Sequence, residues 1–80
     1  MTLTTAIQCR IKELCLERNI TVNKLSIICG ITQSTLNNIF TRPDNKPTVS
    51  TIKKICDGLN MTLYEFFDSD YFNDLEQEVK

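Results

Sequence analysis

The sequence contains no histidine, and its 80 residues include only two glycines and two prolines. Histidine is the side chain most often used as a general base, and it is also a frequent metal ligand, so the chain lacks both of these uses. Gly30 and Gly58 are too far apart to form a glycine-rich phosphate loop, and the four cysteines do not have zinc-knuckle spacing. We therefore expect no catalytic residues, no metal site, no cofactor and no small-molecule substrate.

Long apolar runs are also missing. None approaches the roughly 20 residues that a membrane-spanning helix requires. Residues 1–7 lack the basic start and apolar stretch of a signal peptide. We therefore predict a cytoplasmic protein with no membrane partner. In that compartment Cys9, Cys15, Cys29 and Cys56 should be reduced, and we expect most of them to be core residues. A redox sensor that uses these thiols is a further hypothesis.

The net charge of −1 is unevenly distributed along the chain. Residues 1–60 contain eight basic and four acidic side chains, whereas residues 61–80 contain one basic and six acidic side chains. A phosphate backbone responds to the local field rather than to the total charge. An acidic C-terminus is therefore compatible with a basic, nucleic-acid-binding face in the first 60 residues.

Apolar residues recur at helical spacing, with no strand-like alternation, and predict five helices. The expected helices are about Ala6–Arg18, Val22–Cys29, Gln33–Phe40, Val49 to about Leu59, and one that begins after Thr62. The expected N-caps are Thr5 (with Gln8), Thr21, Thr32, Thr48 and Thr62 (with Glu65). Residues 41–47 read as a polar loop. We divide the chain into a domain, 1–68, and a tail, 69–80, which forms either a short extra helix or a frayed acidic end.

The same spacing predicts which side chains are buried. The expected core includes Ile7, Ile11, Leu14, Cys15, Leu25, Ile28, Cys29, Leu36, Ile39, Val49, Ile52, Ile55, Cys56, Leu59, Leu63, Phe66 and Phe67. Basic residues of the first helix alternate with acidic ones, which suggests pairing on the surface. The residues in question are Arg10, Lys12 and Arg18 with Glu13 and Glu17.

Residues 21–40 have the pattern of a helix-turn-helix, because two short helices are joined at a glycine. Gly30 can make the tight turn, and the small Ser26 suits the contact between the helices. The outward face of the second helix carries Gln33, Ser34, Asn37 and Asn38. Glutamine and asparagine can form two hydrogen bonds with the major-groove edge of adenine.

The segments ITQSTLNNIF, RPDNKPT and IKKICDGLNMTLYEFF extend this pattern. Over about Ile7–Phe67 the chain resembles the Cro/repressor-type (XRE-family) helix-turn-helix domains. The resemblance implies an all-α, lambda-repressor-like fold of five helices. It also implies a sequence-specific transcriptional regulator, of repressor type, whose partner is double-stranded DNA.

Position by position, the resemblance assigns base contacts to Gln33, Ser34, Asn37 and Asn38. It assigns phosphate contacts to Thr21, Asn23, Lys24, Thr32, Thr35, Thr41, Arg42, Asn45 and Lys46. Val22 stands where the family often has a phosphate-binding glutamine. Cys15 and Phe40 stand where many members pair an arginine with a glutamate. Because both partners differ, no buried charge is left unpaired, and we predict that Cys15 and Phe40 are in contact.

An aromatic cluster lies near the end of the chain and exceeds what a domain of this size readily buries. We therefore expect a homodimer with contacts through Phe67, Tyr71 and Phe72. The alternative is a protein-interaction module on the same fold, antitoxin-like or regulator-binding, that uses the acidic, aromatic C-terminus.

Overall fold

The computed structural model describes residues 1–42, 44 and 46–79. The described residues form five α-helices and one short 3₁₀-helix, with no strand among them: α1 (Leu3–Glu17), α2 (Val22–Cys29), α3 (Gln33–Thr41), α4 (Val49–Gly58), α5 (Leu63–Phe67) and η1 (Asp70–Phe72). This confirms the predicted all-α, five-helix architecture. None of the described helices has the length and apolar character of a membrane span.

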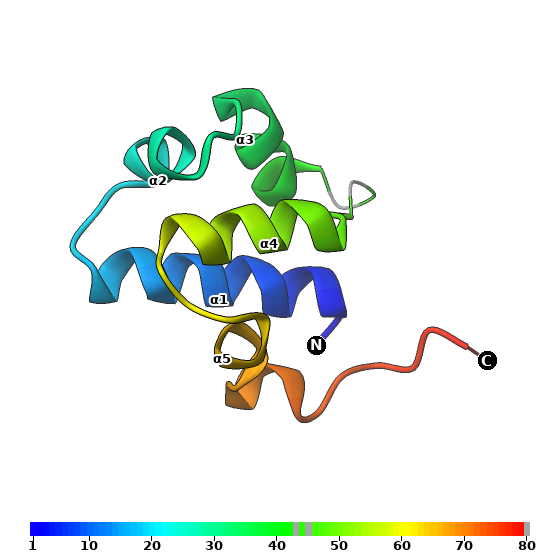
Figure 1. Ribbon diagram of the computed structural model, residues 1–80. Coiled ribbons are helices and arrows are strands. Elements are labelled where there is room, and N and C mark those ends of the chain that lie inside the picture. The colour runs from blue at the N-terminus through cyan, green and yellow to red at the C-terminus, as the bar shows by residue number, and fades with distance from the viewer. Residues whose placement is uncertain (43, 45, 80) are drawn as a thin grey trace.

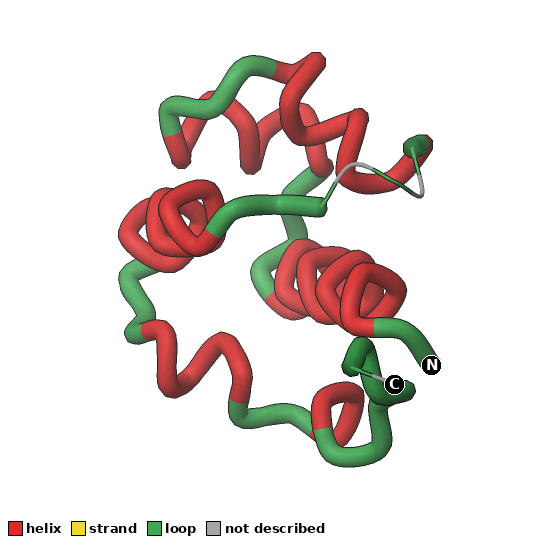
Figure 2. Tube along the Cα trace, turned by 90° about the vertical axis from the view of Figure 1, so that its right-hand side faces the viewer, coloured by secondary structure: helices red, strands yellow, loops and turns green. Residues whose placement is uncertain are grey.

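The helices are arranged in three tiers, with α1 and α4 in the middle (Figure 1). The helices α2 and α3 lie together on one side of this tier, and α5 lies on the other. Figure 2, turned by 90°, shows the same order, with α1 and α4 seen end-on between the outer tiers. The pair α2 and α3 is therefore at one edge of the molecule, where one face of α3 can reach a partner.

A threonine caps the N-terminus of each α-helix. The five N-caps are Thr2, Thr21, Thr32, Thr48 and Thr62, and each hydroxyl accepts a hydrogen bond from the backbone N–H three residues later. Thr62 forms a complete capping box with Glu65, as predicted. An N-cap of this kind contributes about 1 kcal/mol, so the caps fix where each short helix begins.

The predicted start of the first helix was wrong. Thr2, not Thr5, is the cap, and the helix begins at Leu3 rather than Ala6. The physical reason is that Ala6 and Ile7 are both buried, so the apolar face already requires a helical turn before them. Thr5 lies inside this turn, and its N–H donates to the hydroxyl of Thr2.

Three helices end with a residue in the left-handed conformation. These residues are Asn19, Gly30 and Asn60, with φ of 55°, 67° and 57°. After α4, for example, the N–H of Met61 donates to the carbonyl of Cys56 at 2.9 Å. An equivalent hydrogen bond, from a backbone N–H to the carbonyl five positions earlier, follows α1 and α2. This is the hydrogen bond of the Schellman motif. Glycine and asparagine tolerate this conformation best, which explains their position after each helix.

The core is formed mainly by the predicted residues, with three exceptions. Ile28 is 41% exposed, Val49 is 70% exposed and Phe67 is 38% exposed, so their expected burial was wrong. Val49 lies on the same face of α4 as Ile52, three residues later, but it is the first residue of the helix and its side chain stays exposed. Next to Ile28, Cys29 faces α4, and its thiol donates to the carbonyl of Ile55 at 3.7 Å. Cys29 is therefore the buried α2 residue at the contact with α4, and Ile28 reaches the same contact only with part of its side chain, close to Gly58.

Arg10 lies inside the molecule and not on its surface as predicted. It is 9% exposed, and it donates to the carbonyls of Phe66 at 2.7 Å and Glu65 at 2.8 Å. Its remaining N–H group pairs with Glu13. The guanidinium thus adds donors at two carbonyls near the end of α5, of which that of Glu65 also accepts from the N–H of Asp68 at 3.4 Å. Arg10 joins α1 to α5.

The tail contains one short helical turn and then irregular chain. In η1 the ring of Phe72 packs against Phe66 and Phe67, with centroid distances of 6.2 and 4.9 Å. Beyond it, the N–H of Glu76 donates to the carbonyl of Met1 at 3.0 Å. Tyr71, Leu75 and Val79 are spaced by four residues, as on one face of a helix, but no α-helix forms there, and the tail instead lies against the N-terminus.

Gly58 is required by the close approach of α2 and α4. A methyl group at this position would lie 2.6 Å from the sulfur and 3.0 Å from the Cα of Cys29. We expect Gly58→Ala to lower the melting temperature by about 4–8 °C, because the clash outweighs the better helix propensity of alanine by about 1 kcal/mol. In a Cys29→Ala background the sulfur is gone, so Gly58→Ala should lower the melting temperature less than it does in the wild type. Equal losses in both backgrounds, measured by circular dichroism, would contradict this explanation.

Candidate nucleic-acid interface

The turn between α2 and α3 sets the direction in which α3 leaves the domain. Gly30 adopts φ 67°, its N–H donates to the carbonyl of Ile27 at 3.4 Å, and Ile31 N–H donates to Ser26 at 3.1 Å. The side chain of Ile31 is half-buried against the core, and Ser26 is buried. The helix–glycine–helix arrangement predicted for residues 21–40 is therefore present, with a fixed turn.

One face of α3 is buried and the other is polar. Leu36 and Ile39 are 0% and 2% exposed and hold the helix against the core. The polar face carries the predicted base-contacting residues: Gln33, Ser34 and Asn37, which are exposed, and Asn38, which is half-buried. Within the described part of the chain, no hydrogen bond engages these four side chains. Their amides and hydroxyl are available to an external partner.

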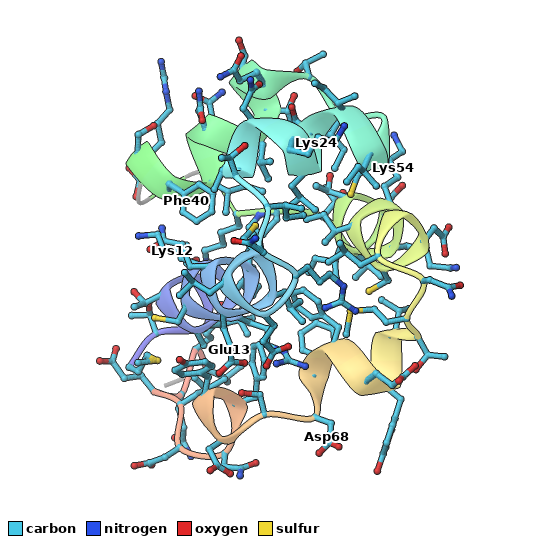
Figure 3. All side chains as sticks on the ribbon, turned by 90° about the vertical axis from the view of Figure 1, so that its left-hand side faces the viewer. Lys12, Glu13, Lys24, Phe40, Lys54 and Asp68 are labelled. Atoms are coloured by element: carbon cyan, nitrogen blue, oxygen red, sulfur yellow. The ribbon has the colours of Figure 1, made fainter. Side chains whose placement is uncertain are left out.

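The first turns of α2 and α3 present donors to solvent. The hydroxyls of Thr21 and Thr32 cap the two helices, at 3.0 and 3.1 Å from the N–H groups of Lys24 and Thr35. Thr32 also donates its hydroxyl proton to Thr35 at 2.8 Å, so the proton of Thr35 remains for another acceptor. Asn23 and Lys24 are exposed, and Figure 3 shows Lys24 projecting from α2. Helix N-termini of this kind favour anions.

The loop after α3 carries the other predicted phosphate contacts. Thr41, Arg42 and Lys46 are all exposed, and the hydroxyl of Thr41 donates to the carbonyl of Asn37 at 3.0 Å. Asn45 lies outside the described residues. Arg42 and Lys46 place two positive charges beside the end of α3.

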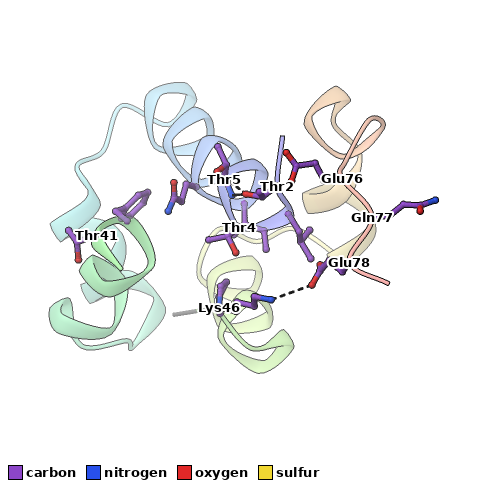
Figure 4. A pocket seen from close by; sticks show the side chains of 13 residues that line it. Thr2, Thr4, Thr5, Thr41, Lys46, Glu76, Gln77 and Glu78 are labelled. Carbon is purple, nitrogen blue, oxygen red and sulfur yellow. Dashed lines mark hydrogen bonds and ion pairs between the residues drawn. The ribbon is translucent and has the colours of Figure 1, made fainter. Parts of the chain in front are cut away.

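The tail brings a negative charge to the same loop, which the sequence analysis missed. The Nζ of Lys46 lies 3.3 Å from Oε1 of Glu78. Figure 4 shows this pair across a groove of about 720 Å³ between the start of α1, the end of α3 and the tail. The charge imbalance between residues 1–60 and 61–80 was the available signal, but it does not say which lysine the tail reaches.

Two side chains of α1 contact the end of α3. The Nε2 of Gln8 donates to the carbonyl of Ile39 at 2.6 Å, and the Nζ of Lys12 lies 5.3 Å from the ring centroid of Phe40. Figure 3 shows Lys12 beside Phe40. The ammonium over the ring face gives Phe40 a partner other than the predicted one. The contact between Cys15 and Phe40 stays a prediction.

The buried thiols have raised pKa values. Burial is the main reason that the pKa of Cys29 is raised to about 11, and the neighbouring Cys15 and Cys56 add to the shift. Burial likewise raises the pKa of Cys15 and of Cys56. Thiolates are the reactive form, so these three thiols behave as core residues and do not favour the redox-sensor hypothesis.

Of the residues predicted for a dimer contact, Phe67 and Phe72 lie beside one another at the α5 end of the molecule, whereas Tyr71 lies against α1 near Leu16. Phe67 is 38% exposed, and Tyr71 and Phe72 are half-buried. The ring of Phe67 lies edge-on to Phe66, with a centroid distance of 5.0 Å. Phe67 is the most exposed of the three side chains.

Two helices joined by a tight glycine turn, with the second presenting a polar face and both N-termini open, define a helix-turn-helix DNA-binding domain. The family described as "Cro/C1-type HTH DNA-binding domain" matches residues 3–70, and the chain belongs to this family. The protein is a DNA-binding regulator and not an enzyme.

Individual relatives agree with this assignment. Over 59 residues the chain is 42% identical to the "SPbeta prophage-derived uncharacterized HTH-type transcriptional regulator YopO" of Bacillus subtilis (strain 168). This match covers 74% of this chain and 83% of that protein. The crystal structure of the prophage Lp1 protein 11 superposes with a TM-score of 0.82 and 31% identity, over 94% of this chain and 99% of that one.

The pair of Lys46 and Glu78 should weaken DNA binding. We expect Glu78→Gln to raise the affinity for a random-sequence duplex about two- to fivefold at low salt, because it frees Lys46 from a competing carboxylate. The gain should disappear as salt is raised. Glu17→Gln is the control, because it changes the net charge equally on an exposed part of α1. Equal gains from both variants in a fluorescence-anisotropy titration would show an effect of total charge alone.

Proposed function

We propose that this protein is a sequence-specific transcriptional repressor that acts by occupying an operator, with α3 in the major groove. The proposal is carried by one observation. Leu36 and Ile39 hold α3 against the core, while its polar face has no partner within the described residues. A helix fixed in this way can enter a major groove without rearrangement, and its amide side chains can read adenine edges. Because its target is DNA, we place the protein in the cytoplasm.

In this proposal, affinity and discrimination come from different residues. Bases are read by Gln33, Ser34, Asn37 and Asn38. Phosphates are bound by Thr21, Asn23, Lys24, Thr32, Thr35, Thr41, Arg42, Asn45 and Lys46. The first turns of α2 and α3 support the phosphate role, because their exposed donors lie where helix dipoles favour anions. Phosphate contacts fix the register, and base contacts select the sequence.

We further propose that the repressor is a homodimer, with contacts through Phe67, Tyr71 and Phe72. The support is the exposed edge of the aromatic cluster, on the side of the domain opposite α2 and α3 (Figure 1). To read two half-sites, such a two-fold dimer would have to hold its two α3 helices roughly 34 Å apart, which is one turn of DNA. Selection of binding sites from random-sequence duplexes should then recover a palindrome. Recovery of a single, non-repeated half-site would count against the dimer.

The role of Gln33 as a base reader can be tested directly. Gln33→Ala should lose roughly 1–3 kcal/mol of binding to the selected site and little on a random duplex, because a lost base contact does not affect phosphate binding. Gln77→Ala, which removes an exposed glutamine from the tail, should leave both affinities unchanged. Competitive mobility-shift titrations measure both values.

Two outcomes would remove parts of the proposal. Equal losses on the two duplexes would show that Gln33 is not a base reader. If the wild-type protein showed no salt-sensitive binding to any duplex, the protein-interaction module would become the better hypothesis.

A further inference from the structure

The last turn of α3 has a carbonyl that its own helix cannot satisfy. The N–H of Arg42 donates to the carbonyl of Asn38 at 3.1 Å, so the next carbonyl in line is that of Ile39. Its helical partner would be the residue four positions later, which is Pro43, and proline has no N–H. Arg42 is extended, with φ −117° and ψ 106°, as expected before a proline. The sequence therefore ends α3 with an unpaired acceptor at Ile39.

Gln8 supplies the missing donor from another helix. Its Nε2 lies 2.6 Å from the carbonyl oxygen of Ile39, 31 residues away along the chain, in a half-buried position. A hydrogen bond shielded from water is stronger than one on the surface. Gln8 thus caps the C-terminal end of α3 across the contact between α1 and α3.

A second contact lies one turn further along α1. Lys12 follows Gln8 by four residues, so the two side chains lie on the same face of α1. Lys12 places its ammonium over Phe40, the residue after Ile39. Together they hold two consecutive residues of α3, on the last turns of the helix that also carry Asn37 and Asn38. The N-terminal end of α3 is fixed separately, by the Gly30 turn.

We propose that Gln8 is a positioning residue of the DNA-binding site, which fixes the C-terminal end of α3 relative to the bases. This inference rests on the proposed function. A recognition site must hold its groups within about 0.5 Å of the productive geometry. Loss of the cap lets the end of α3 tilt, which displaces Asn37 and Asn38 from base edges. Phosphate binding on a random duplex tolerates such a shift, so base discrimination is the quantity that Gln8 controls.

The test uses variants that keep the shape of Gln8 and change its chemistry. Gln8→Met removes the donor, and Gln8→Glu replaces it with a carboxylate that repels the carbonyl. The measured quantity is the ratio of affinities of the full chain for the selected duplex and for a scrambled duplex of the same composition. We expect this ratio to fall about three- to tenfold in Gln8→Met and further in Gln8→Glu.

Thr2→Ala is the stability-matched control. It removes the N-cap of α1, which contributes about as much to stability as one hydrogen bond. Within the described residues, no hydrogen bond joins Thr2 to α3. It should lower the melting temperature while leaving the affinity ratio unchanged. A role of Gln8 in stability alone would instead give the same ratio in the Gln8 variants and the wild type.

Hydrogen exchange at the Arg42 amide measures the position of α3 without DNA. This amide forms the last hydrogen bond of α3, so its exchange should accelerate several-fold in Gln8→Met and not in Thr2→Ala. An unchanged exchange rate, or an unchanged affinity ratio, would overturn the inference. If the wild-type protein itself does not prefer any selected duplex, the proposed function fails, while accelerated exchange would still show that Gln8 holds the end of α3.

Discussion

The burial of Leu36 and Ile39 is the contact on which the DNA-binding surface depends. A helix of nine residues is marginal in isolation, so α3 is stable only because these side chains pack into the core. Their burial also decides which side of the helix faces out, because residues three and four positions away lie on the same face. The glycine turn at one end and the contacts from α1 at the other then fix where that face points.

Much of this arrangement could be predicted because short-range rules govern it. The caps at Thr21, Thr32, Thr48 and Thr62 were correct, since a threonine before an apolar run has few other uses. The glycine turn and the polar face of α3 followed from similarly local patterns. The first cap was misplaced because Thr2 and Thr5 are equally good candidates, and only the burial of Ala6 decides between them.

The features that sequence reasoning missed all depend on contacts between distant residues. Arg10, three residues before Glu13, has the spacing of an exposed ion pair, and nothing local shows that its guanidinium reaches the end of α5. The same is true of Gln8 and Ile39, and of Lys46 and Glu78. Pro43 was one available signal. Because proline has no N–H, the helical carbonyl four residues before it needs a hydrogen-bond donor from elsewhere.

The buried guanidinium of Arg10 has a consequence for how two copies of the chain could meet. Because it holds the carbonyls of Glu65 and Phe66, α5 cannot swing away from α1 without leaving a charge unpaired in the interior. The helix α5, which carries Phe67 and precedes η1, is therefore held in place within a single chain. Association through that face would lose little conformational entropy and would not need exchange of α5 between copies, so the separation of two recognition helices would be set by rigid geometry.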